Sequence, residues 1–227
     1  MENKIIIPLD LEQFAALNLA KKLDPTKCRL KVGSQLFTST GPKLIKDLQF
    51  LGFDVFLDLK FHDIPNTVYQ AIKSAADLGV WMINVHASGG RAMLEASKKA
   101  IEGFDKPPIL IAVTVLTSLS EENLNEIGIK DLSKQVLTLA EISSECELDG
   151  VVCASTDVKA IKNKIGKDFI AVTPGIRPND SEVNDQTRIS TPLEAIKNGS
   201  DYLVIGRPIT KSDDPSSALE NIIQEIS

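Results

Sequence analysis

Short runs of β-branched residues alternate strictly with segments of helical length, and this alternation restricts the possible folds most. The runs are nearly continuous in apolar character, which is typical of strands covered on both faces of a parallel sheet. Helix signals occur between them, such as Pro42 and Pro192 in a first turn and Gly79 and Gly199 after a last one. We predict strands at 4–9, 28–33, 54–60, 81–86, 108–116, 150–154, 168–173 and 201–206. We predict helices near 11–22, 41–51, 66–78, 91–102, 131–145, 156–164, 191–198 and 215–226.

Two architectures suit such a series. A doubly wound open sheet usually has fewer strands in a chain of this length and often carries a GxGxxG turn, and neither feature is present. Eight βα units in 227 residues instead fit a compact (β/α)8 barrel. We therefore predict that residues 1–227 form one α/β domain, a TIM barrel with its active site at the carboxyl ends of the strands.

Charge and cysteine content narrow the class of partners and the compartment. The chain has 25 Lys and Arg against 31 Asp and Glu, a formal net charge of −6. Such a surface repels nucleic acids and anionic membranes, so we expect neither as a partner. Three cysteines without CxxC spacing are typical of reduced, buried thiols. With no signal peptide and no apolar run of membrane-spanning length, we expect a cytoplasmic protein.

Charged residues gather where the predicted strands end. In the segment DLKFHDIPNT at 58–67, Asp58 and Lys60 alternate along a strand and so point the same way. Lys31 on the neighbouring strand could face Asp58, and Asp63 follows closely. An ion-pair network that closes the barrel would explain one such pair. Four charged groups at one face instead indicate catalysis, because an ammonium beside a carboxylate suits the formation and protonation of a carbanion.

A second signal follows the last two predicted strands, where these barrels usually bind phosphate. Gly206 permits close backbone approach, and Arg207 offers a bidentate fork. Arg177 and Gln186 lie on a long polar loop, 177–190, of the kind that often covers an active site. A simple turn is the alternative explanation for a Gly-Arg pair, but its combination with a basic loop in an acidic protein favours a phosphate site.

The remaining sequence features give little support for a metal site or for other common classes of reaction. His62 and His86 lack the spacing of a zinc site, so we predict no metal. The chain has no GxSxG elbow, P-loop or Rossmann fingerprint, which disfavours serine hydrolysis, nucleotide hydrolysis and hydride transfer.

Several motifs together resemble the orotidine 5′-phosphate decarboxylase family. They touch seven of the eight predicted strand ends and keep the family's order: PLD at 8–10, LKVG at 30–33, DLKFHDIPNT at 58–67, NVHASGG at 84–90, TVLTS at 114–118, TPGIRP at 173–178, DQTR at 185–188 and VIGRPIT at 204–210. The resemblance implies conversion of orotidine 5′-monophosphate to UMP and CO₂, the last step of pyrimidine nucleotide synthesis. It implies no metal and no organic cofactor.

The resemblance also implies residue roles. Lys60 would protonate C6 of the pyrimidine, Asp58 would lie against the substrate carboxylate, and Lys31 would orient Asp58 and contact the ribose. Asp63 would reach into the partner subunit's site, so a homodimer with shared active sites is expected. The expected substrate-binding residues are Asp10 at the ribose, Ile64 and Thr67 framing the nucleotide (the threonine from the partner chain), Thr117, and the lid and phosphate positions Arg177, Gln186, Gly206 and Arg207. A serine is expected to read the pyrimidine, and both Ser118 and Ser120 fit the spacing.

Two other functions remain as alternatives. Related barrels with an Asp-x-Lys-x-x-Asp motif include Mg²⁺-dependent sugar-phosphate decarboxylases and aldolase-like synthases, which are expected to have an acidic metal ligand where this chain has Lys31. A non-catalytic phosphate-binding barrel is the other alternative, which an intact Lys60 between two carboxylates disfavours.

Overall fold

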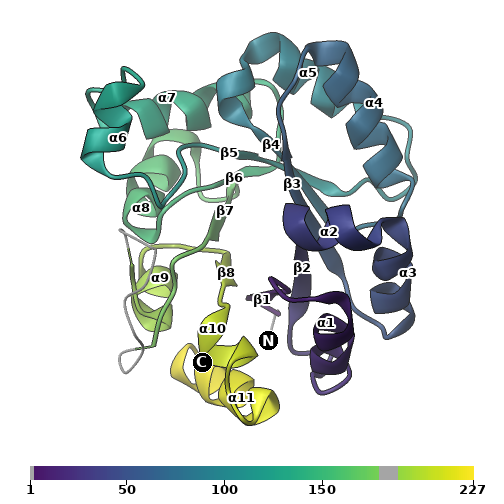
Figure 1. Cartoon of the computed structure of the whole chain (residues 1–227). Coiled ribbons are helices and arrows are strands. Elements are labelled where there is room, and N and C mark those ends of the chain that lie inside the picture. Colours follow the sequence, from purple (N-terminus) through teal and green to yellow (C-terminus); the bar gives the residue numbers. More distant parts are fainter. Residues whose placement is uncertain (1–2, 179–188) are drawn as a thin grey trace.

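Eight parallel strands form a closed barrel whose order follows the sequence (Figure 1). The computed structural model describes residues 3–178 and 189–227. The strands are β1 (Ile5–Pro8), β2 (Arg29–Gly33), β3 (Val55–Phe61), β4 (Met82–His86), β5 (Ile109–Val113), β6 (Gly150–Val152), β7 (Ile170–Thr173) and β8 (Tyr202–Val204). Because β1 pairs with β8 as well as β2, the sheet has no edge. The predicted barrel is confirmed, and the open sheet is excluded.

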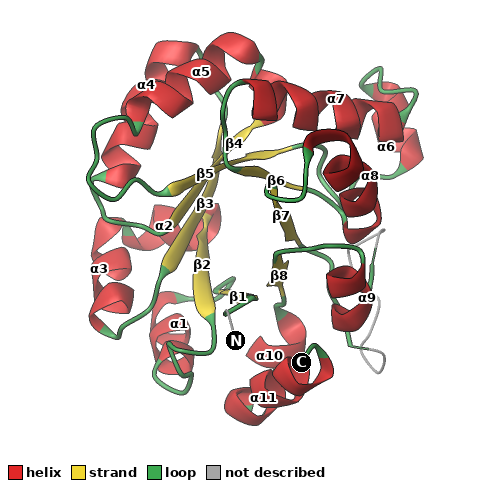
Figure 2. Cartoon of the chain, turned by 180° about the vertical axis from the view of Figure 1, so that it is seen from behind, coloured by secondary structure: helices red, strands yellow, loops and turns green. Residues whose placement is uncertain are grey.

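Helices surround the barrel on its outside (Figure 2). They are α1 (Gln13–Ala20), α2 (Ser34–Thr40), α3 (Pro42–Phe50), α4 (Pro65–Ala76), η1 (Ala87–Gly89, a 3₁₀ turn), α5 (Arg91–Ala100), α6 (Glu121–Glu126), α7 (Leu132–Glu145), α8 (Ser155–Ile165), α9 (Pro192–Lys197), α10 (Arg207–Thr210) and α11 (Pro215–Glu225). No helix among the described residues is long and apolar enough to cross a membrane.

The predicted helices and strands are found within a few residues of their expected positions, with differences at short elements. The prediction missed α2, which buries only Leu36 and so has no apolar periodicity. It also missed α6, which begins at a capping box of Ser120 and Asn123 rather than the usual Glu or Gln at the third position. Strand β6 ends at Val152, two residues earlier than predicted, because Ala154 already caps α8.

Apolar residues fill both faces of the strands, as the continuous apolar runs predicted. One cluster fills the barrel interior with alternating side chains from several strands, among them Ile6, Phe56, Met82, Ile111, Val172 and Val204. A larger cluster packs the outer strand faces against the helices, and Ile5 and Ile7 belong to it. The alternation of Ile5, Ile6 and Ile7 between the two clusters shows the period of two that a strand imposes. The barrel is thus a packed core below its mouth.

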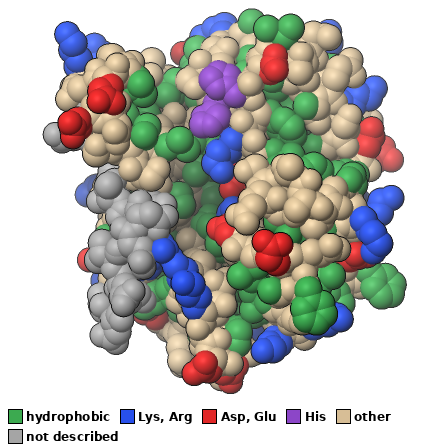
Figure 3. All heavy atoms as spheres, viewed as in Figure 1, with side chains coloured by type: hydrophobic (Ala, Val, Ile, Leu, Met, Phe, Trp, Pro, Cys, Tyr) green, Lys and Arg blue, Asp and Glu red, His purple; other side chains and the backbone are tan. Residues whose placement is uncertain are grey.

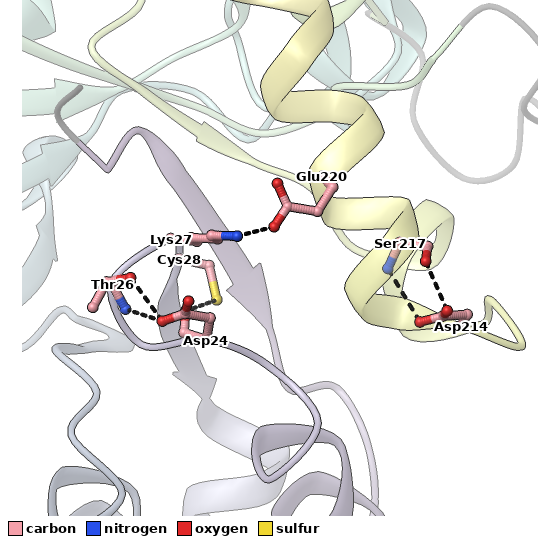
Figure 4. Close-up of polar contacts among 7 residues, drawn as sticks. All are labelled: Asp24, Thr26, Lys27, Cys28, Asp214, Ser217 and Glu220. Atoms are coloured by element: carbon pink, nitrogen blue, oxygen red, sulfur yellow. Dashed lines mark hydrogen bonds and ion pairs between the residues drawn. The ribbon is translucent and has the colours of Figure 1, made fainter.

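An ion pair links the last helix to the start of the barrel (Figure 4). The ammonium of Lys27, just before β2, pairs with Glu220 on α11. Asp24 accepts hydrogen bonds from the backbone N–H and hydroxyl of Thr26.

Cys28 is fully buried, and this burial raises its pKa to about 12, so its thiol stays protonated. All three cysteines are buried and free, as predicted from their spacing.

We predict that Gly150→Ala destabilises the fold more than a glycine substitution on the surface. An added Cβ would lie 2.2 Å from the carbonyl oxygen of Ile170, its partner on β7, where backbone cannot yield. We expect urea unfolding to show a loss of about 3 kcal/mol. In the control Gly128→Ala, where φ is 83° and no atom lies within 4 Å of the added Cβ, only backbone strain acts, about 1 kcal/mol. Equal losses would contradict the close approach of β6 and β7.

Candidate active site

A cavity of about 480 Å³ opens at the carboxyl ends of the strands, a volume suited to a small organic ligand. Figure 3 shows this face, hollowed at the centre, with hydrophobic side chains in the hollow and charged side chains at its rim. Eight of the predicted site residues line the cavity: Asp10, Lys31, Asp58, Lys60, Thr117, Arg177, Gly206 and Arg207.

Asp58 on β3 is the centre of the charged network. Its Oδ2 lies 2.9 Å from Nζ of Lys31, and its Oδ1 lies 2.6 Å from Nζ of Lys60. Burial alone would raise the pKa of Asp58, but the two ammonium groups outweigh it and lower that pKa below its usual value. Burial likewise acts to lower the pKa of Lys31, but Asp58 and Asp10 outweigh it and raise that pKa. Both groups are therefore charged at neutral pH.

The backbone explains why these side chains meet. In the pairing of β2 with β3, Lys31 lies opposite Phe56, and Asp58 is two residues farther along on the same face. Lys60 has a left-handed backbone conformation, with φ of 50°, and the pairing of β3 with β4 is irregular at this point. The ammonium of Lys60 therefore reaches Asp58 from a bulge, and not through the regular strand alternation from which we predicted their proximity.

Sequence reasoning missed Asn84, which is fully buried on β4. Its amide nitrogen donates to Oδ1 of Asp58 at 2.7 Å, and its amide oxygen accepts from the backbone N–H of Lys60 at 2.8 Å. The search for charged residues at strand ends passed over this uncharged one. The available signal was a polar residue between the apolar Ile83 and Val85 of the strand.

Three predicted residues lie outside the cavity. Asp63, Ile64 and Thr67 are exposed on the segment after β3 and at the start of α4, and 67% of Ile64 is accessible. The carboxylate of Asp63 accepts the backbone N–H of Ile64 at 2.6 Å. Gln186 lies outside the described residues.

Cations gather at the opposite side of the cavity, after β7 and β8. Arg177, Arg207 and Lys211 all line it there, and Lys211 was not predicted. Gly206 lies next to β1, since an added Cβ would be 3.1 Å from Cγ of Pro8. This side of the cavity can therefore bind an anionic group close to the backbone.

The two serines after β5 differ in their surroundings. Ser118 lines the cavity. The hydroxyl of Ser120 instead accepts the backbone N–H of Asn123 at 3.3 Å and caps α6. Of the two, Ser118 is therefore placed to contact a ligand.

The two histidines lie next to each other, with ring centroids 5.4 Å apart. Burial lowers the pKa of His86, and the neighbouring His62 and Lys60 lower it further. In the part of the chain that the structure describes, no group of three or more His, Cys, Asp or Glu side chains could hold a metal ion.

A closed (β/α)8 barrel with a charged cavity at the carboxyl ends of its strands is the architecture of TIM-barrel enzymes. The model of the orotidine 5′-phosphate decarboxylase / HUMPS family matches residues 3–222. The chain belongs to this family.

Similar proteins cover nearly the whole chain. Orotidine 5′-phosphate decarboxylase of Saccharophagus degradans is 54% identical over 225 residues, which span 98% of this chain and 94% of that protein. The enzyme of that name from Actinobacillus pleuropneumoniae is also 54% identical, over 98% of both chains. A crystal structure of orotidine 5′-phosphate decarboxylase from Lactobacillus acidophilus superposes with a TM-score of 0.87 at 40% identity and covers 99% of both chains.

We predict that Asp58→Asn destabilises the protein at neutral pH, because it leaves the buried ammonium of Lys31 without its main partner. The expected loss is about 3 kcal/mol. Because the pKa of Asp58 is lowered in the folded state, its contribution is present above the unfolded pKa, about 3.9, and is lost as pH falls through the folded pKa. Urea unfolding from pH 7 to 3 should show the gap between wild type and variant closing below about pH 4.

The matched control is Asp47→Asn, which removes an ion pair with Lys43 on the surface of α3. This change should cost less than about 0.5 kcal/mol at any pH. A similar cost for both variants would show that the Asp58 network adds no particular stability.

Proposed function

We propose that this chain catalyses the decarboxylation of orotidine 5′-monophosphate to UMP and CO₂ without a metal or organic cofactor, in the last step of UMP synthesis. The observation that carries the proposal is Asp58 between two ammonium groups in the cavity mouth. The relatives at 54% identity that carry the decarboxylase name support it.

The reaction needs a positive charge and a proton at one carbon. When the bond between C6 and the carboxylate carbon breaks, CO₂ leaves and the electron pair stays on C6. The ammonium of Lys60 stabilises that pair and transfers a proton to C6, and it then regains a proton from solvent. Asp58 lies against the substrate carboxylate, and Lys31 holds Asp58 in place and reaches the ribose beside Asp10. Loss of the carboxylate charge as CO₂ departs relieves its repulsion with Asp58.

The other side of the cavity would bind the phosphate. Arg207 and Arg177 supply cations there, Gly206 supplies close backbone, and we assign Gln186 to the same group. Binding energy from this remote group can be used to hold the pyrimidine against Lys60. Thr117 and Ser118, from the loop after β5, would contact the pyrimidine from the third side.

We also propose that the chain is one catalytic domain that works in the cytoplasm as a homodimer, with neither nucleic acid nor membrane as a partner. Asp63 and Thr67 are exposed and do not line the cavity of their own chain, which suits residues that complete the partner's site. Ile64, two-thirds exposed between them, would be covered at the same interface.

The Mg²⁺-dependent sugar-phosphate reactions are less well supported. Nζ of Lys31 lies 2.9 Å from Asp58 and 3.6 Å from Asp10, between the two carboxylates. A divalent cation bound by these carboxylates would be repelled by the ammonium between them.

We predict that purified protein consumes orotidine 5′-monophosphate, followed by ultraviolet absorbance, equally well with and without EDTA. Lys60→Ala should lower kcat by at least ~10³-fold, because it removes both the charge and the proton donor at C6. The control Lys43→Ala, on the surface of α3, should match wild type. No turnover by wild type, or turnover only with Mg²⁺, would refute the proposal.

We predict that two inactive variants restore activity when their subunits are exchanged. A mixed dimer of Lys60→Ala and Asp63→Ala chains contains one site with both residues intact, so random mixing should return about a quarter of wild-type activity. The control mixture of Lys60→Ala and Asp58→Ala should stay inactive, since both residues come from one chain in every site. Failure of the first mixture would place Asp63 in its own chain's site or outside the machinery.

A further inference from the structure

Asn84 lies at the irregular point of the barrel. Strand β3 pairs with β4 at Leu57 and Ile83, and pairing resumes only at Phe61 and Val85. Between these two pairs β3 has three residues, whereas β4 has only Asn84. The regular backbone pairing is therefore interrupted where the two catalytic residues of β3 are found.

The side chain of Asn84 replaces the missing backbone contacts. Its amide oxygen accepts the N–H of Lys60 at 2.8 Å, and this backbone has a left-handed conformation that is unfavourable for a residue with a side chain. An unpaired N–H in this partly buried position would be unfavourable. The amide thus stabilises the backbone conformation from which the ammonium of Lys60 enters the cavity.

The same amide also fixes Asp58. Its nitrogen donates to Oδ1 at 2.7 Å, the oxygen that also accepts from Lys60, while Oδ2 is paired with Lys31. The carboxylate is therefore held by three donors from three neighbouring strands and cannot rotate freely. A carboxamide supplies both a donor and an acceptor without adding charge. The asparagine side chain reaches both partners here.

We infer that Asn84 is a positioning residue, which sets Asp58 and Lys60 against the reacting carbon by bonding both at once. The inference rests on the proposed decarboxylation. Asn84 does not line the cavity, so its effect passes through these two residues. The arginines that would bind the phosphate lie on the other side of the barrel, and loss of Asn84 should therefore affect turnover more than binding.

Two variants test this inference. Asn84→Leu keeps the branching at Cγ and removes both hydrogen bonds. Asn84→Asp keeps the acceptor for the Lys60 N–H, but its carboxyl can donate to Asp58 only when protonated. The control is Ser97→Ala, which removes a fully buried hydroxyl on α5 that donates to the carbonyl of Met93 and does not line the cavity. For each protein we would measure kcat, KM, the Kd of UMP, and hydrogen exchange of the Lys60 amide.

Asn84→Leu should lower kcat by about 10²-fold, the effect of a displacement near 1 Å, while the Kd of UMP changes by less than about threefold. Its Lys60 amide should exchange faster than in wild type, whereas Asn84→Asp should keep that amide protected. Ser97→Ala should match wild type in every readout.

The pH dependence separates positioning from a general loss of structure. The ratio of kcat for Asn84→Asp to that of wild type should rise as pH falls from 8 to 6, because protonation restores the donor to Asp58. The ratio for Asn84→Leu should stay flat. The carboxyl introduced at position 84 would face Asp58. The charged and titratable groups around Asp58 are Lys31 on β2, Lys60 on β3 and His86 on β4, with Asp10 beyond Lys31 and His62 beyond His86.

Each outcome decides the question. Unchanged kcat in folded Asn84→Leu would overturn the inference, as would an equal loss in Ser97→Ala. If Asn84→Leu does not fold, a pH-independent ratio for Asn84→Asp overturns it. Absence of turnover by wild type would refute the proposed function instead, and exchange of the Lys60 amide would still show whether Asn84 holds the bulge.

Discussion

The buried carboxylate of Asp58 is the interaction on which the site depends. A lone carboxylate at this depth would be protonated or would destabilise the barrel, so its charge requires the ammonium groups of Lys31 and Lys60. The buried ammonium of Lys31 needs the carboxylate for the same reason. Stability and site geometry are therefore coupled: the ion pairs that orient Lys60 are the ones that make the buried charge of Asp58 tolerable inside the protein.

Much of this molecule could be predicted from its sequence because two signals are strong. Apolar strands alternating with helices specify the barrel. Charged residues such as Lys31 and Asp58 in those strands have few purely structural explanations. Asn84 could not be found in this way, because an amide carries no charge and its importance depends on a change of register that no local pattern encodes. Short helices such as α6 begin at capping residues and lack the periodicity by which longer helices are found.

The exposed residues after β3 illustrate a different limit. Asp63, Ile64 and Thr67 are next to the catalytic strand in sequence, yet none lines the cavity of its own chain. The position of a residue next to a motif in the sequence therefore does not show whether that residue lines the cavity of its own chain. The contribution across a subunit interface that we propose for them would be a property of two chains, and a single chain shows only their exposure, including that of the apolar Ile64.

The two groups of charges in the cavity come from opposite ends of the chain. Asp10, Lys31, Asp58 and Lys60 belong to the first three βα units, whereas Arg177 and Arg207 follow the last two strands. A bound nucleotide would contact both groups and so connect the first and last parts of the barrel, next to the pairing of β1 with β8. Ligand binding should therefore oppose separation of β1 from β8, so that the bound ligand also stabilises the closed barrel.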